Sequence, residues 1–88
     1  MKIIITGHAS FEAKRRGVPE ELIKTIVSNP EQRLSSKKGR VIVQSRYYDQ
    51  EEKKGMLLRV VGIETSDKFE VITVYKTSKI SKYWVGGG

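Results

Sequence analysis

Hydrophobic residues recur with a helical period in the first third of the chain and with a strand period in the rest. The first third predicts one strand and two short helices, at residues 2–6, 8–16 and 19–28. Thr6 can cap the first helix, Gly17 separates the two, and Pro19 opens the second where a missing N–H costs nothing. The apolar residues of the second helix form one stripe and so predict one buried face: Leu22, Ile23, Ile26 and Val27.

After Pro30 the hydrophobic period shortens to two residues. Strands are predicted at residues 32–36, 40–48, 56–64 and 69–76, with the most apolar, 56–64, near the centre of a sheet. Hairpin-length connections favour antiparallel pairing, and a final segment, 77–84, predicts a short helix or tail. We therefore expect a single α+β domain over residues 1–85, with an N-terminal strand, two helices and a sheet of three to four antiparallel strands. Residues 86–88 are expected to be a disordered tail.

The composition is that of one small basic domain. The 88 residues include 17 Lys and Arg against 10 Asp and Glu, which gives a net charge of +7. One histidine and no cysteine exclude a disulfide scaffold, a thiolate zinc site and a cysteine nucleophile, so no metal or cofactor is expected. No apolar run approaches the roughly 18 residues of a membrane span, and no signal region is visible, so we expect a cytoplasmic protein. Its charge makes a polyanion the first partner to consider.

The single histidine is one candidate for chemistry. His8 lies at the start of a predicted helix, where the helix dipole favours the neutral imidazole of a general base. Glu12 and either Arg15 or Arg16 follow at spacings that share one helix face with it. The alternative is a partly exposed histidine that forms only local hydrogen bonds.

A charged residue interrupts the most apolar predicted strand. Arg59 alternates with Leu57 and Val61 on one face, so its guanidinium must reach solvent, a carboxylate or a bound anion. The planar fork of arginine suits a phosphate held by two hydrogen bonds. The alternatives are an ion pair with a carboxylate such as Glu12 or Glu70, or exposure on an open face of the sheet.

The C-terminal segment combines cations with aromatic rings. Three lysines recur every three residues, with aromatic residues interleaved: Lys76, Lys79, Lys82, Tyr75, Tyr83 and Trp84. Cations hold phosphates while aromatic rings stack on unpaired bases, which is how single-stranded nucleic acid is bound. The alternative is an amphipathic tail that docks Ile80 and Trp84 on the core and leaves its lysines in water, and both can hold at once. Arg46 is a further candidate, whereas Tyr47 beside it faces the other side of its strand.

Several strings of residues resemble a small prokaryotic family, domain of unknown function family 4258. They are His8-Ala9, Arg16-Gly17-Val18 before a Glu-rich helix start, and the closing string from Val71 to Ile80. The resemblance covers nearly the whole chain, and the closing string is its more specific part. Family members are expected to have an arginine four residues after the histidine, where this chain has Glu12. The order of elements is also similar to that of RelE/ParE-type toxins.

The resemblance to these toxins implies metal-independent RNA cleavage, an RNA groove on the open face of the sheet and, in many cases, an antitoxin partner. His8 would then act as general base or acid. Arg59 with Lys79 would stabilise charge on the phosphate, and Tyr75 or Tyr83 would stack on a base or supply a proton. Further side chains would bind RNA, free or on the ribosome: Arg15, Arg16, Arg46, Lys76, Lys82 and Tyr83. A non-catalytic RNA-binding module and a protein-interaction or dimerising domain are the alternatives.

Overall fold

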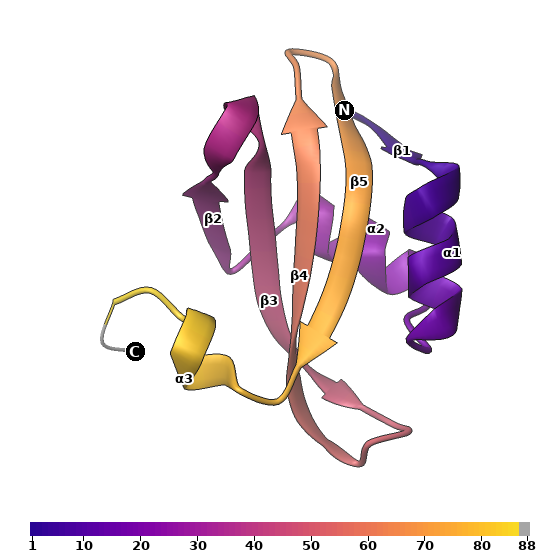
Figure 1. Cartoon of the computed structure of the whole chain (residues 1–88), viewed down its shortest axis with the longest axis vertical. Coiled ribbons are helices and arrows are strands. Elements are labelled where there is room, and N and C mark those ends of the chain that lie inside the picture. Colours follow the sequence, from indigo (N-terminus) through magenta and orange to yellow (C-terminus); the bar gives the residue numbers. More distant parts are fainter. Residues whose placement is uncertain (87–88) are drawn as a thin grey trace.

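The computed structural model describes residues 1–86 and has the predicted α+β order of elements (Figure 1). The strands are β1 (Lys2–Ile5), β2 (Gln32–Ser35), β3 (Val41–Asp49), β4 (Lys54–Glu64) and β5 (Lys68–Thr77). The helices are α1 (Gly7–Arg15), α2 (Glu20–Ser28) and α3 (Ile80–Tyr83), and a 3-10 turn, η1 (Lys37–Gly39), joins β2 to β3. The predicted disordered tail comprises residues 86–88, and two of these, 87 and 88, lie outside the described residues. Among those described, no helix is long and apolar enough to cross a membrane.

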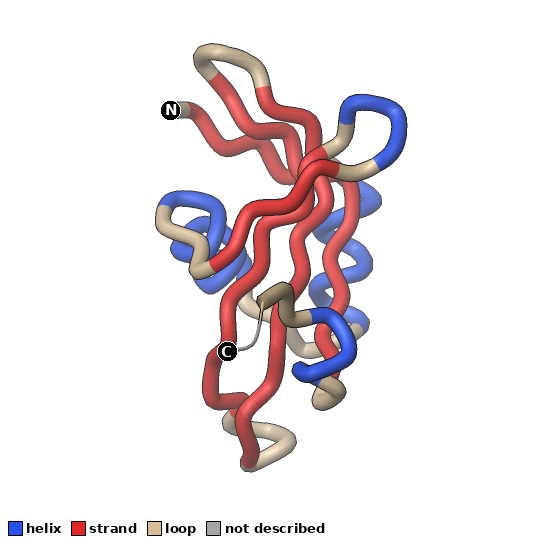
Figure 2. The backbone as a smooth tube through the Cα atoms, turned by 90° about the vertical axis from the view of Figure 1, so that its left-hand side faces the viewer, coloured by secondary structure: helices blue, strands red, loops and turns tan. Residues whose placement is uncertain are grey.

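The strands form one five-stranded sheet in the order β1-β5-β4-β3-β2 (Figure 1), and Figure 2 shows its twist. Strands β2 to β5 pair antiparallel, as their short connections predict, and β4 lies at the centre. The structure adds a feature that the hydrophobic pattern does not predict. Strand β1 pairs in parallel with β5, with Lys2 opposite Lys68, so the sheet is mixed.

The core lies between one face of the sheet and the helices α1 and α2. Thr6 caps α1 as predicted, since its hydroxyl oxygen accepts a hydrogen bond from the backbone N–H of Ala9 at 3.2 Å. Ala9 and Ala13 are fully buried, and α2 contributes Ile23, Ile26 and Val27. The strands complete the cluster with Val43, Leu58, Val60, Phe69, Val71 and Val74. Figure 1 shows α2 behind the sheet and α3 in front of it, so α3 lies on the other face.

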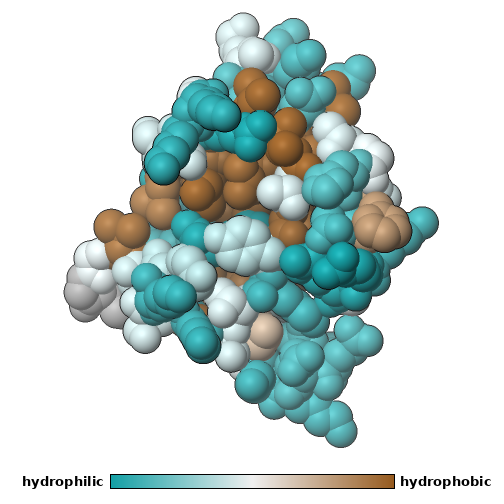
Figure 3. Space-filling view, in the orientation of Figure 1, coloured by the Kyte–Doolittle hydropathy of each residue, from teal (hydrophilic) through white to brown (hydrophobic). Residues whose placement is uncertain are grey.

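Strand register aligns the side chains of that other face in rows across the sheet. One row is polar and consists of Gln32, Gln44, Arg59 and Tyr75, on β2, β3, β4 and β5 in turn. The next row is mostly apolar and consists of Leu34, Ile42, Val61 and Thr73. Figure 3 shows an area of hydrophobic side chains on this same face of the molecule. The polar row is the part over which the C-terminal segment lies.

A buried carboxylate fastens the β3–β4 hairpin to β5. Asp49 Oδ2 accepts hydrogen bonds from Lys76 Nζ and from the Tyr47 hydroxyl, each at 2.9 Å. Its Oδ1 accepts the backbone N–H groups of Glu51 and Glu52 at 2.9 and 3.0 Å. The backbone N–H of Glu52 and the Lys76 ammonium hold the pKa of Asp49 well below its usual range. The ionised form of Asp49 therefore stabilises the fold.

We expect this carboxylate to make the stability of the fold depend on pH. The folded pKa of Asp49 is lowered, so its contribution is fully present above the unfolded value, about pH 4, and is lost as pH falls through the folded pKa. Asp49→Asn should lower the melting temperature at neutral pH and flatten its dependence on pH below about pH 5. Thermal unfolding at several pH values measures both effects. Asp67→Asn, at an exposed turn, is the matched control and should keep the wild-type profile; a wild-type profile in Asp49→Asn would contradict the prediction.

Candidate functional site

Arg59 lies on the central strand with its side chain on the face opposite α1 and α2. The residue is only 8% exposed. Its Nε donates a hydrogen bond to Gln44 Oε1 at 2.8 Å, and its Nη1 donates to the Tyr75 hydroxyl. Within residues 1–86 it forms no ion pair, and Glu12, one of the partners considered from sequence, pairs with Arg16 instead. The guanidinium of Arg59 is therefore hydrogen-bonded to neutral groups, which do not neutralise its charge.

One nitrogen of this guanidinium is left for a ligand. Nη2 forms no hydrogen bond within the described residues, in contrast to Nε and Nη1. In the same part of the chain no side-chain nitrogen or oxygen is both buried and unpaired. Among residues 1–86, Nη2 is therefore the nitrogen of this guanidinium that no protein group occupies.

Two tyrosine rings flank the guanidinium of Arg59. Its Cζ lies 4.4 Å from the ring centroid of Tyr83 and 5.4 Å from that of Tyr75. The two rings meet edge to face with centroids 6.2 Å apart. Lys82 Nζ lies 5.4 Å from the centroid of Tyr83. Since aromatic faces attract a cation without neutralising it, they stabilise the charge and leave it available to an anion.

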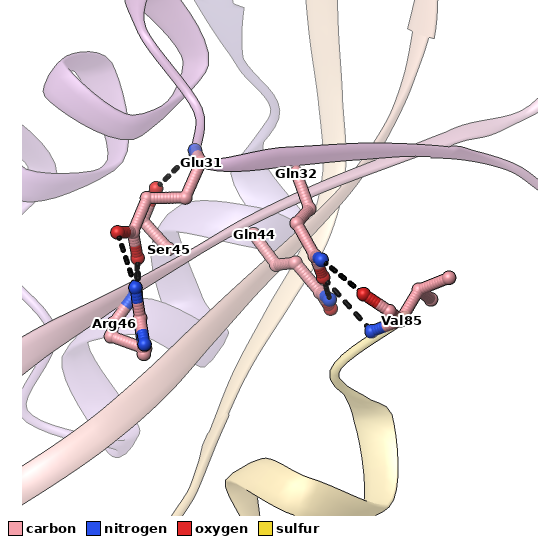
Figure 4. A network of polar contacts seen from close by, with 6 residues as sticks. All are labelled: Glu31, Gln32, Gln44, Ser45, Arg46 and Val85. Carbon is pink, nitrogen blue, oxygen red and sulfur yellow. Dashed lines mark hydrogen bonds and ion pairs between the residues drawn. The ribbon is translucent and has the colours of Figure 1, made fainter. Parts of the chain in front are cut away.

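Side-chain amides hold the C-terminal segment against the sheet (Figure 4). Gln32 Nε2 donates to the carbonyl oxygen of Val85 at 2.7 Å, and Gln32 Oε1 accepts the N–H of Val85 at 3.1 Å. The amide of Gln44, which is fully buried, donates to Gln32 Oε1 at 2.7 Å and to the carbonyl oxygen of Tyr83 at 3.1 Å. Residues 83–85 are thus attached by two glutamines rather than by a β ladder.

Arg46 connects Trp84 to the segment that precedes β2. Its Cζ lies 4.2 Å from the centroid of the Trp84 ring. Its Nε and Nη2 donate to the two carboxylate oxygens of Glu31 at 3.1 and 3.0 Å, a bidentate pair visible in Figure 4. The hydrogen bond from the Arg46 side chain lowers the pKa of Glu31. Arg46 is therefore already paired with Glu31, and on the α3 face it stacks on the indole ring of Trp84.

Besides Arg46, five of the ten residues predicted for the site lie on or next to the α3 face. Tyr75 and Tyr83 contact Arg59, and Lys82 lies against Tyr83. Lys79 is exposed and immediately precedes α3. The candidate site is defined by these five residues.

His8 is separated from this group by the sheet. It is exposed in the first turn of α1, and that helix packs through Ala9 and Ala13 on the opposite face. Its side chain forms no hydrogen bond with any described residue. The structure therefore does not bring His8 to the phosphate that Arg59 would hold.

Three predicted RNA-binding residues also lie on the helix side. Arg15 and Arg16 pair with Glu12, and Lys76 pairs with Asp49. All three line a hollow of about 520 Å³, which Glu51 and Glu52 also line. Carboxylates therefore balance these cations, in contrast to Arg59.

Sequence reasoning missed Gln44 and Gln32. A signal was present, because Gln44 interrupts an apolar strand just as Arg59 does, and it alternates with Ile42 on one face. A glutamine in a strand is a weaker signal than an arginine, because a buried amide can find hydrogen-bond partners in the backbone, in other side chains or in water. Only the register shows that Gln44 lies directly opposite Arg59.

Within residues 1–86, no group of three or more His, Cys, Asp or Glu side chains is arranged to hold a metal ion. Comparison of the chain with protein-family models, curated proteins and solved structures gives no match. The resemblance to family 4258 and to RelE/ParE-type toxins therefore stays a prediction. The function has to be inferred from the geometry of the site itself.

Proposed function

We propose that this chain binds single-stranded RNA through the α3 face of the sheet, with Arg59 on a phosphate. The observation that carries the proposal is a guanidinium, 8% exposed, whose hydrogen-bond partners Gln44 and Tyr75 are both neutral. An arginine that only stabilises a fold is usually placed against a carboxylate, because an unpaired buried charge is costly. Arg59 has no carboxylate partner, and its Nη2 no hydrogen-bond partner, among residues 1–86, which suits an arriving phosphate oxygen.

The surroundings of Arg59 favour a single strand over a duplex. Lys79 and Lys82 are exposed at and within α3, whose Tyr83 contacts Arg59, and they can contact neighbouring phosphates. Tyr83 and Trp84 are partly exposed aromatic residues, and bases stack on such residues only when they are unpaired. The net charge of +7 attracts any polyanion, and the rings select among polyanions.

Binding of a fluorescent single-stranded RNA at increasing salt tests the proposal. We expect affinity to fall steeply between roughly 50 and 200 mM salt, because each neutralised phosphate adds about −0.7 to the slope of log affinity against log salt. A duplex of the same sequence should bind more weakly. No binding of the single strand at low salt, or tighter binding of the duplex, would overturn the proposal.

Lys82→Ala should weaken RNA binding and reduce the salt slope by about 0.7, the value for one lost phosphate contact. The lysine is exposed and lies next to the Tyr83 ring, so its loss should not destabilise the fold. Lys24→Ala is the matched control, since Lys24 is exposed on α2 and changes the net charge equally. A slope reduced equally in both variants would mean that only net charge matters.

Metal-independent RNA cleavage by a toxin-like protein is a second candidate function. The contact between Arg59 Nη1 and the Tyr75 hydroxyl favours it, because that hydroxyl accepts from Arg59 and keeps its own proton to donate. The 2′-hydroxyl would attack phosphorus and release its proton to water, and Tyr75 would donate its proton to the 5′-oxygen as the P–O bond to it breaks. Arg59 and Lys79 would stabilise the charge on the phosphate. In this candidate His8 takes no part, and a neutralising antitoxin would cover the α3 face.

Labelled RNA incubated with the protein and EDTA distinguishes the two functions. For cleavage we expect fragments with wild type and His8→Ala, but none with Tyr75→Phe, although Tyr75→Phe still binds RNA. Growth arrest on expression should follow the same pattern. Intact RNA after hours with wild type would exclude cleavage and leave binding as the function.

A further inference from the structure

Gln44 joins the two halves of the candidate site through a single amide. It is fully buried, and its Oε1 accepts from Arg59 Nε at 2.8 Å. Its Nε2 donates to the carbonyl oxygen of Tyr83 at 3.1 Å and to Gln32 Oε1 at 2.7 Å. We infer that Gln44 is the positioning residue of the Arg59 site, and that it couples anion binding to the docking of residues 80–85. The anion in this inference rests on the proposed function, whereas the link from Arg59 through Gln44 to the docked segment belongs to the chain alone.

The chemistry of an amide explains why this position holds glutamine. The amide oxygen orients the guanidinium without neutralising it, and the two amide hydrogens satisfy two acceptors. The reverse orientation would put the amide hydrogens against the Nε–H of Arg59, and its oxygen against two other oxygens. Glutamate at the same place would neutralise Arg59 and lose both donors. Methionine would keep the charge of Arg59 but could not orient it.

The same hydrogen bonds continue to the end of the described chain. Gln44 donates to Gln32, and Gln32 holds both backbone groups of Val85. Between these two attachments, Tyr83 places its ring 4.4 Å from the Cζ of Arg59. An anion that fixes Arg59 therefore fixes Gln44 and favours the docked segment. Because coupling is reciprocal, a docked segment must strengthen anion binding by the same factor.

Trp84, the one tryptophan of the chain, is a natural reporter of docking. Its ring stacks under Arg46 at 4.2 Å while the segment is docked, so release should shift its fluorescence emission. We expect the shift in Gln44→Glu and in Gln44→Met even without RNA, because both variants lose the hydrogen bond to Tyr83. Gln50→Glu, at an exposed glutamine of the β3–β4 hairpin, makes the same charge change and should keep the wild-type emission.

RNA binding by the same variants separates positioning from a structural role. Gln44→Glu should lose at least about tenfold in affinity and about 0.7 in salt slope, since the phosphate contact of Arg59 is neutralised. Gln44→Met should lose less affinity and keep the wild-type slope. Gln32→Met, which frees Val85 but spares the contact of Gln44 with Arg59, should shift the emission of Trp84 and keep the slope.

The outcomes distinguish failure of this inference from failure of the proposed function. If wild type binds no RNA, the proposed function fails, and the emission of Trp84 still tests whether Gln44 holds the docked segment. Wild-type emission in both Gln44 variants would overturn the coupling. Wild-type affinity and slope in Gln44→Glu would overturn the positioning role. Circular dichroism establishes that the variants are folded, and Gln32→Met tests the coupling if neither Gln44 variant folds.

Discussion

Arg59→Met should lower the affinity for single-stranded RNA by about tenfold to a hundredfold and lower the melting temperature only moderately. A hydrogen bond to a charged group contributes about 1.5–3 kcal/mol, and each 1.4 kcal/mol is a factor of ten in affinity. Arg59 has no carboxylate partner within the described residues, so its removal leaves no unpaired buried charge behind. The substitution does remove the donor to the fully buried Oε1 of Gln44, and a buried acceptor without a partner costs about 1–3 kcal/mol.

Arg33→Met is the matched control for this variant. Arg33 lies on β2 opposite Val43, a core residue, and pairs with Glu64, so it belongs to the helix-covered face. The substitution removes the same group and the same unit of charge. Equal losses of affinity in the two variants would show that net charge rather than the Arg59 site holds the RNA. A loss of stability well above about 3 kcal/mol in Arg59→Met would show that this arginine is structural.

Local pattern predicted the elements of the fold because each element has a local cause. Thr6, Gly17 and Pro19 set the limits of the first two helices through hydrogen bonding and backbone geometry. Nothing within residues 2–5 identifies β5 as the parallel partner of β1, since pairing depends on contacts far away in sequence. Likewise, strict alternation would place Ile72 beside Val74, but the register shift between Val61 and Gly62 places Val71 in the core instead.

The candidate site was predictable only in part, and for the same reason. Arg59 is conspicuous in an apolar strand, and Tyr83 stands out in a basic tail, so both could be found from sequence. Helix spacing places His8 on a face with Glu12 but does not show which side of the sheet the helix covers. Gln44 became significant only when the register placed it opposite Arg59. Local chemistry identifies candidates, and topology determines which of them meet.

Phe69→Ala should have the largest effect on stability, a loss of about 3–5 kcal/mol. Phe69 is 1% exposed and packs in the core cluster on β5. A Cβ at Gly62 would lie 2.3 Å from Phe69 Cε1 and 2.6 Å from the carbonyl oxygen of Glu70, so the ring fills space that this glycine leaves open. With the ring removed, Gly62 has no side chain to occupy the cavity. The predicted loss is a large part of the roughly 5–15 kcal/mol that stabilises an ordinary domain.

The control is the one other phenylalanine of the chain. Phe11 is 61% exposed on α1, and Phe11→Ala should change the stability by less than about 0.5 kcal/mol. The better helix propensity of alanine offsets part of any packing lost there. Urea denaturation of both variants measures the difference, with an equal slope indicating that the unfolded states are comparable. Since both substitutions remove the same group, equal losses would mean that Phe69 is not in the core, and α1 and α2 would then have to pack on the sheet differently.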